Sequence, residues 1–174
     1  ARGGQASNSS AIKAGGYTGT AHTANAETWN GTSWTEVGNL NTSRYALNGD
    51  GATSTAAIAF GGYSSTNLTN TEDWNGSTWT EVNDLNTARN ALGGAGSSTS
   101  ALAFGGASSQ ALTEEWQGAG AAVFAWSSSN AMNTGRRQLA GGGSQTAGIA
   151  FAGENSGAAQ VANTEQYNGS TWTE

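Results

Sequence analysis

A short motif of the form W-N-G-x-x-W-T-E recurs along the chain and divides it into similar units. It reads WNGTSWTEV at 29–37 and WNGSTWTEV at 74–82, and it returns as YNGSTWTE at 167–174. Its second aromatic position recurs at intervals of 45, 47 and 46 residues, at Trp34, Trp79, Trp126 and Trp172. A basic residue opens each unit, at Arg2, Arg44, Arg89 and either Arg136 or Arg137. The 174 residues therefore form one domain of four repeats, 1–43, 44–88, 89–135 and 136–174.

Each unit is predicted to contain four short β-strands. The first follows the arginine and is rich in Gly and Ala, as in ALNGDGA. The second alternates in the two-residue period of a strand, as in Ile58-Ala59-Phe60. The third is the T-E-x-W/Y stretch, whose Asn-Gly pair favours a tight hairpin into the fourth strand, T-W-T-E. A four-stranded antiparallel unit of about 45 residues is typical of a propeller blade, which buries its faces only by stacking on its neighbours.

The repeated residues resemble the kelch repeat. In that pattern a small apolar strand ends in Gly-Gly, an aromatic residue lies on the third strand, a Trp lies on the fourth, and an Arg opens the next unit. Here the diglycines are at 15–16, 61–62 and 105–106, and Ala152-Gly153 takes this place in the fourth unit. The resemblance covers the whole chain and implies an all-β fold, a β-propeller of four kelch-like four-stranded antiparallel blades. The variant rich in Asn-Gly, Thr and Trp is similar to repeats of bacterial and bacteriophage surface proteins.

The number of blades makes closure of the propeller a separate question. Kelch propellers usually have five to seven blades, whereas this chain has four units. The linker VGNLNTSR has copies before the third and fourth units, but none precedes Arg2 or follows Glu174. We expect a closed four-bladed ring without the usual strand-exchange latch, because a Gly-rich first strand suits a narrow axis. The alternative is a larger ring, or an open array that a second chain completes.

Two sets of repeated residues have predicted structural roles. An Arg and a Glu recur together, and a buried Arg–Glu pair at each blade junction would satisfy both charges; the alternative is a ring of arginines around an anionic ligand. The repeated tryptophans are expected to pack blade against blade, with sugar stacking as the alternative. The residues are Arg2, Arg44, Arg89, Arg136, Glu27, Glu72, Glu114, Glu165, Trp34, Trp79, Trp126 and Trp172.

Candidate binding residues lie in the variable loops and in the linkers. In kelch propellers these segments form one face, and partners commonly bind there. Tyr17 and Tyr63 each follow a diglycine directly, and Asn41, Asn86 and Asn133 lie in the linkers. An aromatic ring beside Asn, Ser and Thr side chains suits a sugar or a protein loop, whereas loop anchoring is the alternative role of the tyrosines.

The first unit departs from the repeat at two positions. Lys13 stands where the other units have Ala, and Ala14 stands where they have Phe. In the third unit GAGAAVFAW replaces the hairpin. This asymmetry indicates either a contact surface or sequence drift.

Composition argues against several functional classes. Only 10% of the residues are charged, the net charge is −6, and the basic residues are scattered, so we expect no nucleic-acid binding. The chain has no Cys, and His22 is its only histidine, which leaves no metal-ligand cluster and no cofactor site. The longest apolar runs, such as 121–126, are too short to span a bilayer. Because convergent titratable groups are also lacking, we expect no enzymatic activity.

Two non-enzymatic functions remain. The first is a lectin-like or adhesive module that binds carbohydrate or a surface protein, and the Asn/Ser/Thr/Trp/Tyr-rich surface suits display outside a cell or on a virion. Repeated pockets would make such binding multivalent. The second is a structural subunit that assembles with copies of itself, as a homo-oligomer or polymer, into a filament, tube or shell, because strand edges with few lysines oppose association weakly. No signal peptide is present in the sequence.

Overall fold

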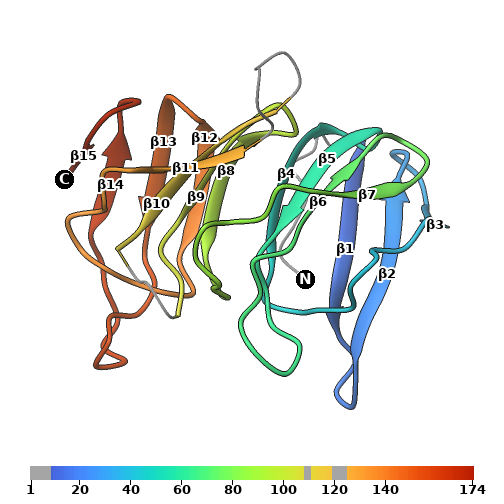
Figure 1. Cartoon of the computed structure of the whole chain (residues 1–174), viewed down its shortest axis with the longest axis horizontal. Helices are drawn as coiled ribbons and strands as arrows, with labels where there is room; N and C mark the ends of the chain where they lie inside the picture. Colours follow the sequence, from blue (N-terminus) through green and yellow to red (C-terminus); the bar gives the residue numbers. More distant parts are fainter. Residues whose placement is uncertain (1–8, 108–110, 119–124) are drawn as a thin grey trace.

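The computed structural model describes residues 9–107, 111–118 and 125–174, and within these ranges every regular element is a β-strand (Figure 1). The first sheet contains β1 (Ala11–Tyr17), β2 (His22–Trp29) and β3 (Trp34–Val37). The second contains β4 (Asn48–Thr53), β5 (Ala56–Phe60), β6 (Thr71–Trp74) and β7 (Trp79–Val82). The third contains β8 (Gly93–Ser97), β9 (Ser100–Phe104), β10 (Thr113–Gln117) and β11 (Ala125–Ser129). The fourth contains β12 (Ala140–Ser144), β13 (Ala147–Phe151), β14 (Thr164–Tyr167) and β15 (Trp172–Thr173).

Each sheet is an antiparallel meander in which strands that follow one another in the chain also pair. The second, third and fourth sheets have four strands, as the repeat predicts, and the first has three among the described residues. The Gly-rich segment that opens the first unit lies within residues 1–8, outside the described ranges, together with Arg2. The four consecutive sheets fit a propeller-like all-β fold with one sheet for each repeat.

The predicted Asn-Gly hairpins connect the last two strands of three sheets. In the second sheet the side-chain carbonyl of Asn75 accepts the backbone N–H groups of Ser77 and Thr78, both at 2.9 Å. Gly76 follows with a φ of 93°, a backbone conformation that favours glycine. The turn sets the register, so that Trp74 and Trp79 lie opposite each other with ring centroids 5.4 Å apart. Equivalent cross-strand aromatic pairs occur in the other sheets, at Trp29/Trp34, Trp116/Trp126 and Tyr167/Trp172.

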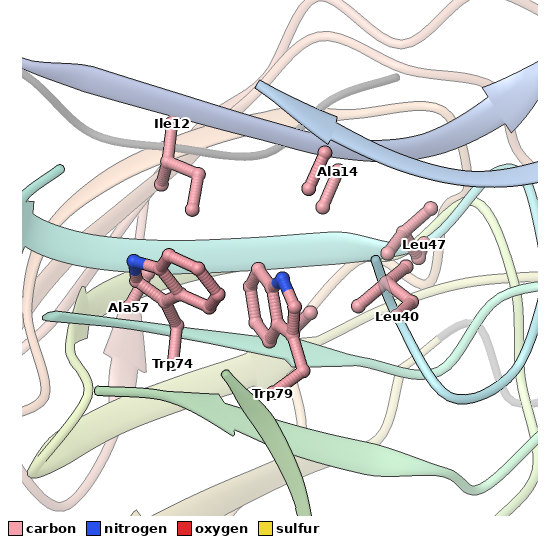
Figure 2. Packing of buried hydrophobic residues seen from close by; sticks show 9 residues of the cluster. Ile12, Ala14, Leu40, Leu47, Ala57, Trp74 and Trp79 are labelled. Carbon is pink, nitrogen blue, oxygen red and sulfur yellow. The ribbon is translucent and has the colours of Figure 1, made fainter. Parts of the chain in front are cut away.

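Apolar side chains form three separate cores, one between each two consecutive sheets. Successive side chains of a strand point to opposite faces, so Ile58 and Phe60 on β5 pack toward the third sheet while Ala57 and Ala59 pack toward the first. Figure 2 shows the first of these cores, where Trp74 and Trp79 of the second sheet face the side chains of β1. Burying one large apolar side chain contributes about 1.5–3 kcal/mol, so the sheets stabilise one another.

Closure of the four sheets into a ring stays a prediction, because the first strand of the first unit lies outside the described residues. Consecutive sheets contact each other through β4 and β8 and through β8 and β12, and the first and fourth sheets lie at opposite ends of the molecule (Figure 1). Trp34 in the first sheet is 45% exposed and Phe151 in the fourth is 41% exposed, so no sheet covers either of them. The angle between sheets depends on the narrow, Gly-rich first strands and also on the bulky residues of the outer strands, such as Trp126, that fill each junction.

Candidate functional site

The three described arginines of the repeat each form a buried ion pair with the glutamate of their own unit. Nitrogen–oxygen distances are 2.6 Å for Arg44–Glu72, 2.7 Å for Arg89–Glu114 and 2.5 Å for Arg136–Glu165. All six side chains are at most 2% exposed. The backbone carbonyl of each arginine accepts an N–H from the diglycine of the preceding unit, at 2.8–3.0 Å. The pairs therefore lie at the junctions between sheets, and their charges are used within the protein.

The linker asparagines attach each linker to the sheet that follows it. Both the backbone N–H and the side-chain amide of Asn86 donate to Oε2 of Glu114, at 2.7 and 2.9 Å, and the amide also donates to the carbonyl of Trp126 at 3.0 Å. Asn41 makes the equivalent bonds to Glu72 and Trp79. Asn133 donates its backbone N–H to Glu165 and its amide to the carbonyl of Trp172. These asparagines were predicted as ligand-binding, but the contacts of their donors are internal.

The first unit has an ion pair that the other units lack, and its Arg2 lies outside the described residues. Glu27 pairs with Lys13 across β1 and β2, with Nζ 2.5 Å from Oε2, and the two side chains are 51% and 33% exposed. The Nζ atom also lies 5.5 Å from the ring centroid of Trp34. The departure at Lys13 therefore places an exposed ion pair at the first end of the molecule.

Three of the four repeated tryptophans are buried. Trp79, Trp126 and Trp172 are 4–7% exposed, and the latter two donate their indole N–H across a junction to the hydroxyls of Thr71 and Thr113. Buried indoles of this kind pack sheets together and do not stack on a sugar.

Four aromatic side chains from the first two units form a cluster on the surface. Tyr17 ends β1 and His22 begins β2, while Tyr45 follows Arg44 in the linker to β4. The ring centroid of Tyr45 lies 5.4 Å from Tyr17, 5.2 Å from His22 and 5.5 Å from Tyr63. Two backbone hydrogen bonds between Tyr45 and Tyr63, of 3.0 and 2.8 Å, hold the two segments together. The structure thus brings the predicted residues Tyr17 and Tyr63 into one cluster, through Tyr45.

Tyr45 and His22 were not predicted as members of a site. Tyr45 could have been found from the sequence, because it is an aromatic residue at a position where the repeat is not aromatic. The residue after the arginine is Tyr45 in the second unit but Asn90 and Arg137 in the next two.

His22 was assigned no site, since no second histidine and no cysteine accompanies it. The pairing of β1 with β2 places His22 opposite Tyr17. A hydrogen bond of 3.3 Å from the N–H of Arg44 to the carbonyl of Thr23 attaches the next segment to β2, and the rings of His22 and Tyr45 stack at an interplanar angle of 25°.

A hollow of about 340 Å³ lies beside the cluster. Its lining is formed by Tyr17, Tyr45, Ala46, Leu47, Ala91, Leu92 and Gln138. Ala46, Ala91 and Gln138 occupy the same position in three successive units, and each has a positive φ of 52–54°. The N–H of Ala91 donates to the carbonyl of Ala46, and that of Gln138 donates to the carbonyl of Ala91, both at 2.8 Å. The hollow therefore lies where residues of all four units meet, with two tyrosines at its wall and no charged side chain among the described residues that line it.

One buried carboxyl group stands apart from these sites. Asp50 on β4 is 5% exposed, and its Oδ2 atom has no hydrogen-bond partner among the residues that the structure describes. Burial raises the pKa of Asp50 to about 7. The equivalent positions of the third and fourth units are Ala95 and Gly142, so this group belongs to the second unit alone.

Neither a metal-ligand cluster nor a membrane-spanning helix is present within residues 9–107, 111–118 and 125–174. No group of three or more His, Asp or Glu side chains there is arranged to hold a metal ion. No helix in these ranges is long and apolar enough to cross a membrane.

Comparison with known proteins adds no family to this description. No protein-family model matches the chain, and no curated protein is significantly similar to it. The aromatic cluster and the adjoining hollow form the candidate functional site.

Proposed function

We propose that this protein is a non-enzymatic binding module that takes a neutral carbohydrate into the hollow beside Tyr17 and Tyr45. The observation that carries the proposal is the exposed aromatic surface at the wall of that hollow, where Tyr17 is 55% exposed although it belongs to a cluster of four aromatic rings. Tyrosine offers an apolar face to the C–H groups of a sugar and a hydroxyl to its oxygens.

The size and charge of the hollow support a small, uncharged ligand. Its volume of about 340 Å³ lies at the lower end of the range of about 300–1,000 Å³ that is usual for ligand pockets. Its lining combines apolar residues, such as Leu47 and Leu92, with the polar residues Tyr45 and Gln138. A mixture of apolar walls and a few neutral polar groups suits a mono- or disaccharide better than an anionic ligand.

We further propose that the four sheets are blades of a kelch-type β-propeller displayed outside a cell or on a virion. The repeated Arg–Glu pairs, the diglycines and the aromatic hairpins support the kelch resemblance. A charged fraction of 10% and the abundance of Asn, Ser and Thr support an extracellular surface.

The experiment is a glycan-array screen of the purified protein, followed by calorimetric titration of the retained glycan against three variants. Tyr17→Ala should weaken binding at least about tenfold, because it removes the most exposed ring of the cluster, whereas Tyr17→Phe should retain most of the affinity if stacking dominates. Leu112→Ala is the matched control, since it removes a 37% exposed apolar side chain from the third unit, outside the cluster.

All three variants should melt within a few degrees of the parent protein. Retention of no glycan on the array, or an affinity that Tyr17→Ala leaves unchanged, would exclude carbohydrate binding at this hollow.

A further inference from the structure

The two ends of the row of sheets expose side chains that are buried at the equivalent positions inside it. Phe151 on β13 is 41% exposed, whereas its counterparts Phe60 and Phe104 are 0% exposed. Trp34 on β3 is 45% exposed, whereas the other three repeated tryptophans are at most 7% exposed. One end of the molecule thus presents an uncovered Phe and the other an uncovered Trp.

Inside the chain these two residue types meet at each described junction between the later sheets. Phe60 of the second sheet packs edge-on against Trp126 of the third, with centroids 4.9 Å apart and an interplanar angle of 66°. Phe104 packs in the same way against Trp172 of the fourth sheet, with ring centroids 5.1 Å apart and an interplanar angle of 63°. Phenylalanine from one sheet and tryptophan from the next therefore form a repeated contact of nearly constant geometry.

A hydrogen bond accompanies each of these aromatic contacts. The indole N–H of Trp126 donates to Oγ1 of Thr71, and that of Trp172 donates to Oγ1 of Thr113, both at 3.0 Å. The threonine comes from the same sheet as the phenylalanine, on the neighbouring strand. In the fourth sheet this position is Thr164, which pairs with Phe151 in the register of β13 and β14 and is exposed.

We propose that the fourth sheet of one copy docks on the first sheet of a second copy, with Phe151 and Thr164 of one copy against Trp34 of the other. Both halves of the internal junction are present on this one chain, at opposite ends and at the same register positions as their buried counterparts. Ile149, which is half-buried, corresponds to the buried Ile58 and Leu102 and would add to the contact. The occupant that fits each end is therefore another copy of this chain, in a head-to-tail arrangement.

Lys13 makes this contact weaker than the internal junctions. It stands on the first sheet where Ala59, Ala103 and Ala150 are buried in the others, and its ammonium group pairs with Glu27 beside Trp34. Docking would withdraw this ion pair from water, which costs free energy even when the two charges remain paired. Lys13→Ala should therefore strengthen the association of the two copies.

The test is the molecular mass in sedimentation velocity over a wide range of concentration. The measured mass of the parent protein should rise above that of one chain as the concentration rises. It should level off at the mass of two chains if the assembly closes, and it should continue to rise if the assembly is an open filament. Lys13→Ala should associate at lower concentration than the parent. Leu112→Glu, an exposed change outside both ends, should leave the masses unchanged.

The decisive variants are Trp34→Glu and Phe151→Glu, which alter exposed residues and should therefore retain the parent's melting temperature. Each should be monomeric by itself, because each lacks one half of the junction. Their equimolar mixture should form a dimer and nothing larger, since one junction pairs the intact Phe151 of the first variant with the intact Trp34 of the second.

A parent protein that is monomeric at every concentration would overturn the proposal, as would a Trp34→Glu variant that still self-associates. Glycan binding at Tyr17 is measured separately and does not depend on either result.

Discussion

Trp126 donates its indole N–H to the hydroxyl of Thr71 across the junction between the third and second sheets, at 3.0 Å. The equivalent indole of Trp79 is also buried, but its N–H has no partner among the described residues. The reason lies in the first unit, where Ala26 takes the place of Thr71 in the strand register. A single missing hydroxyl thus distinguishes the first junction from the second.

Restoring that hydroxyl should stabilise the protein. Ala26→Thr is expected to raise the free energy of unfolding in urea by about 1 kcal/mol, the usual net contribution of a hydrogen bond. Ala26→Val is the matched control, because valine has nearly the shape of threonine but cannot accept from the indole. If the threonine variant is no more stable than the valine variant, the indole N–H of Trp79 already has a partner.

Breaking a buried ion pair should be costly. Glu114→Ala leaves the guanidinium of Arg89 buried without its carboxylate, and it removes the acceptor of two Asn86 donors. We expect a loss of about 3–5 kcal/mol in urea unfolding. The control Glu81→Ala removes an exposed glutamate of the repeat and should change stability by less than about 0.5 kcal/mol. A similar small loss for both variants would contradict the structural role of the pair.

Asp50 should make stability depend on pH. Its pKa in the folded protein is about 7, whereas an exposed aspartate has a pKa of about 3.9, so the folded state holds the proton more tightly than the unfolded state. The stabilisation from the protonated carboxyl is complete below about pH 4 and is lost as the pH rises through 7. Each pH unit in this window lowers the free energy of unfolding by about 1.4 kcal/mol, so the total loss is about 4 kcal/mol.

The measurement is a series of urea unfolding curves between pH 4 and 8, for the parent and for Asp50→Asn. Asparagine has nearly the same shape as the protonated acid but does not ionise, so the variant should lose most of this pH dependence and be the more stable protein at pH 8. If the free energy of unfolding changed with pH in the same way for the two proteins, Asp50 would not titrate in this window.

The diglycine of the third unit should not tolerate a side chain. Gly105 has a φ of 68°, and a Cβ atom there would lie 2.6 Å from the carbonyl oxygen of Arg136. Gly105→Ala should therefore cost about 2 kcal/mol or more in thermal or urea unfolding. At Gly142 on β12 a Cβ would meet no atom within 4 Å, so Gly142→Ala should be neutral or slightly stabilising. Equal effects at the two positions would contradict the close approach at Gly105.

Much of the local structure follows from the repeat. The four units, the order of their strands and the Asn-Gly hairpins were predictable because each depends on residues close together in sequence, as in Asn75-Gly76. The ion pair between Arg89 and Glu114 was predictable as a type of contact. A repeated Arg and Glu in a weakly charged chain are each stabilised by the opposite charge of the other once they are buried.

The composition of the candidate site was only partly predictable. Tyr17 and Tyr63 were identified from their position after a diglycine, but Tyr45 and His22 join them through long-range contacts. The linker asparagines were assigned to a ligand, because the sequence does not show that Asn86 reaches the carboxylate of Glu114, 28 residues away.

By itself the sequence determined the repeat, the strands and the residues that alternate between the two faces of each sheet, since these depend on local propensity and on a two-residue period. Only the tertiary structure decided the arrangement of the sheets, because the angle between neighbours depends on how side chains such as Phe60 and Trp126 fill a junction. It also decided which copies of a repeated residue are buried. Phe104 and Phe151 occupy the same position of the repeat, yet only Phe104 has a following sheet to cover it.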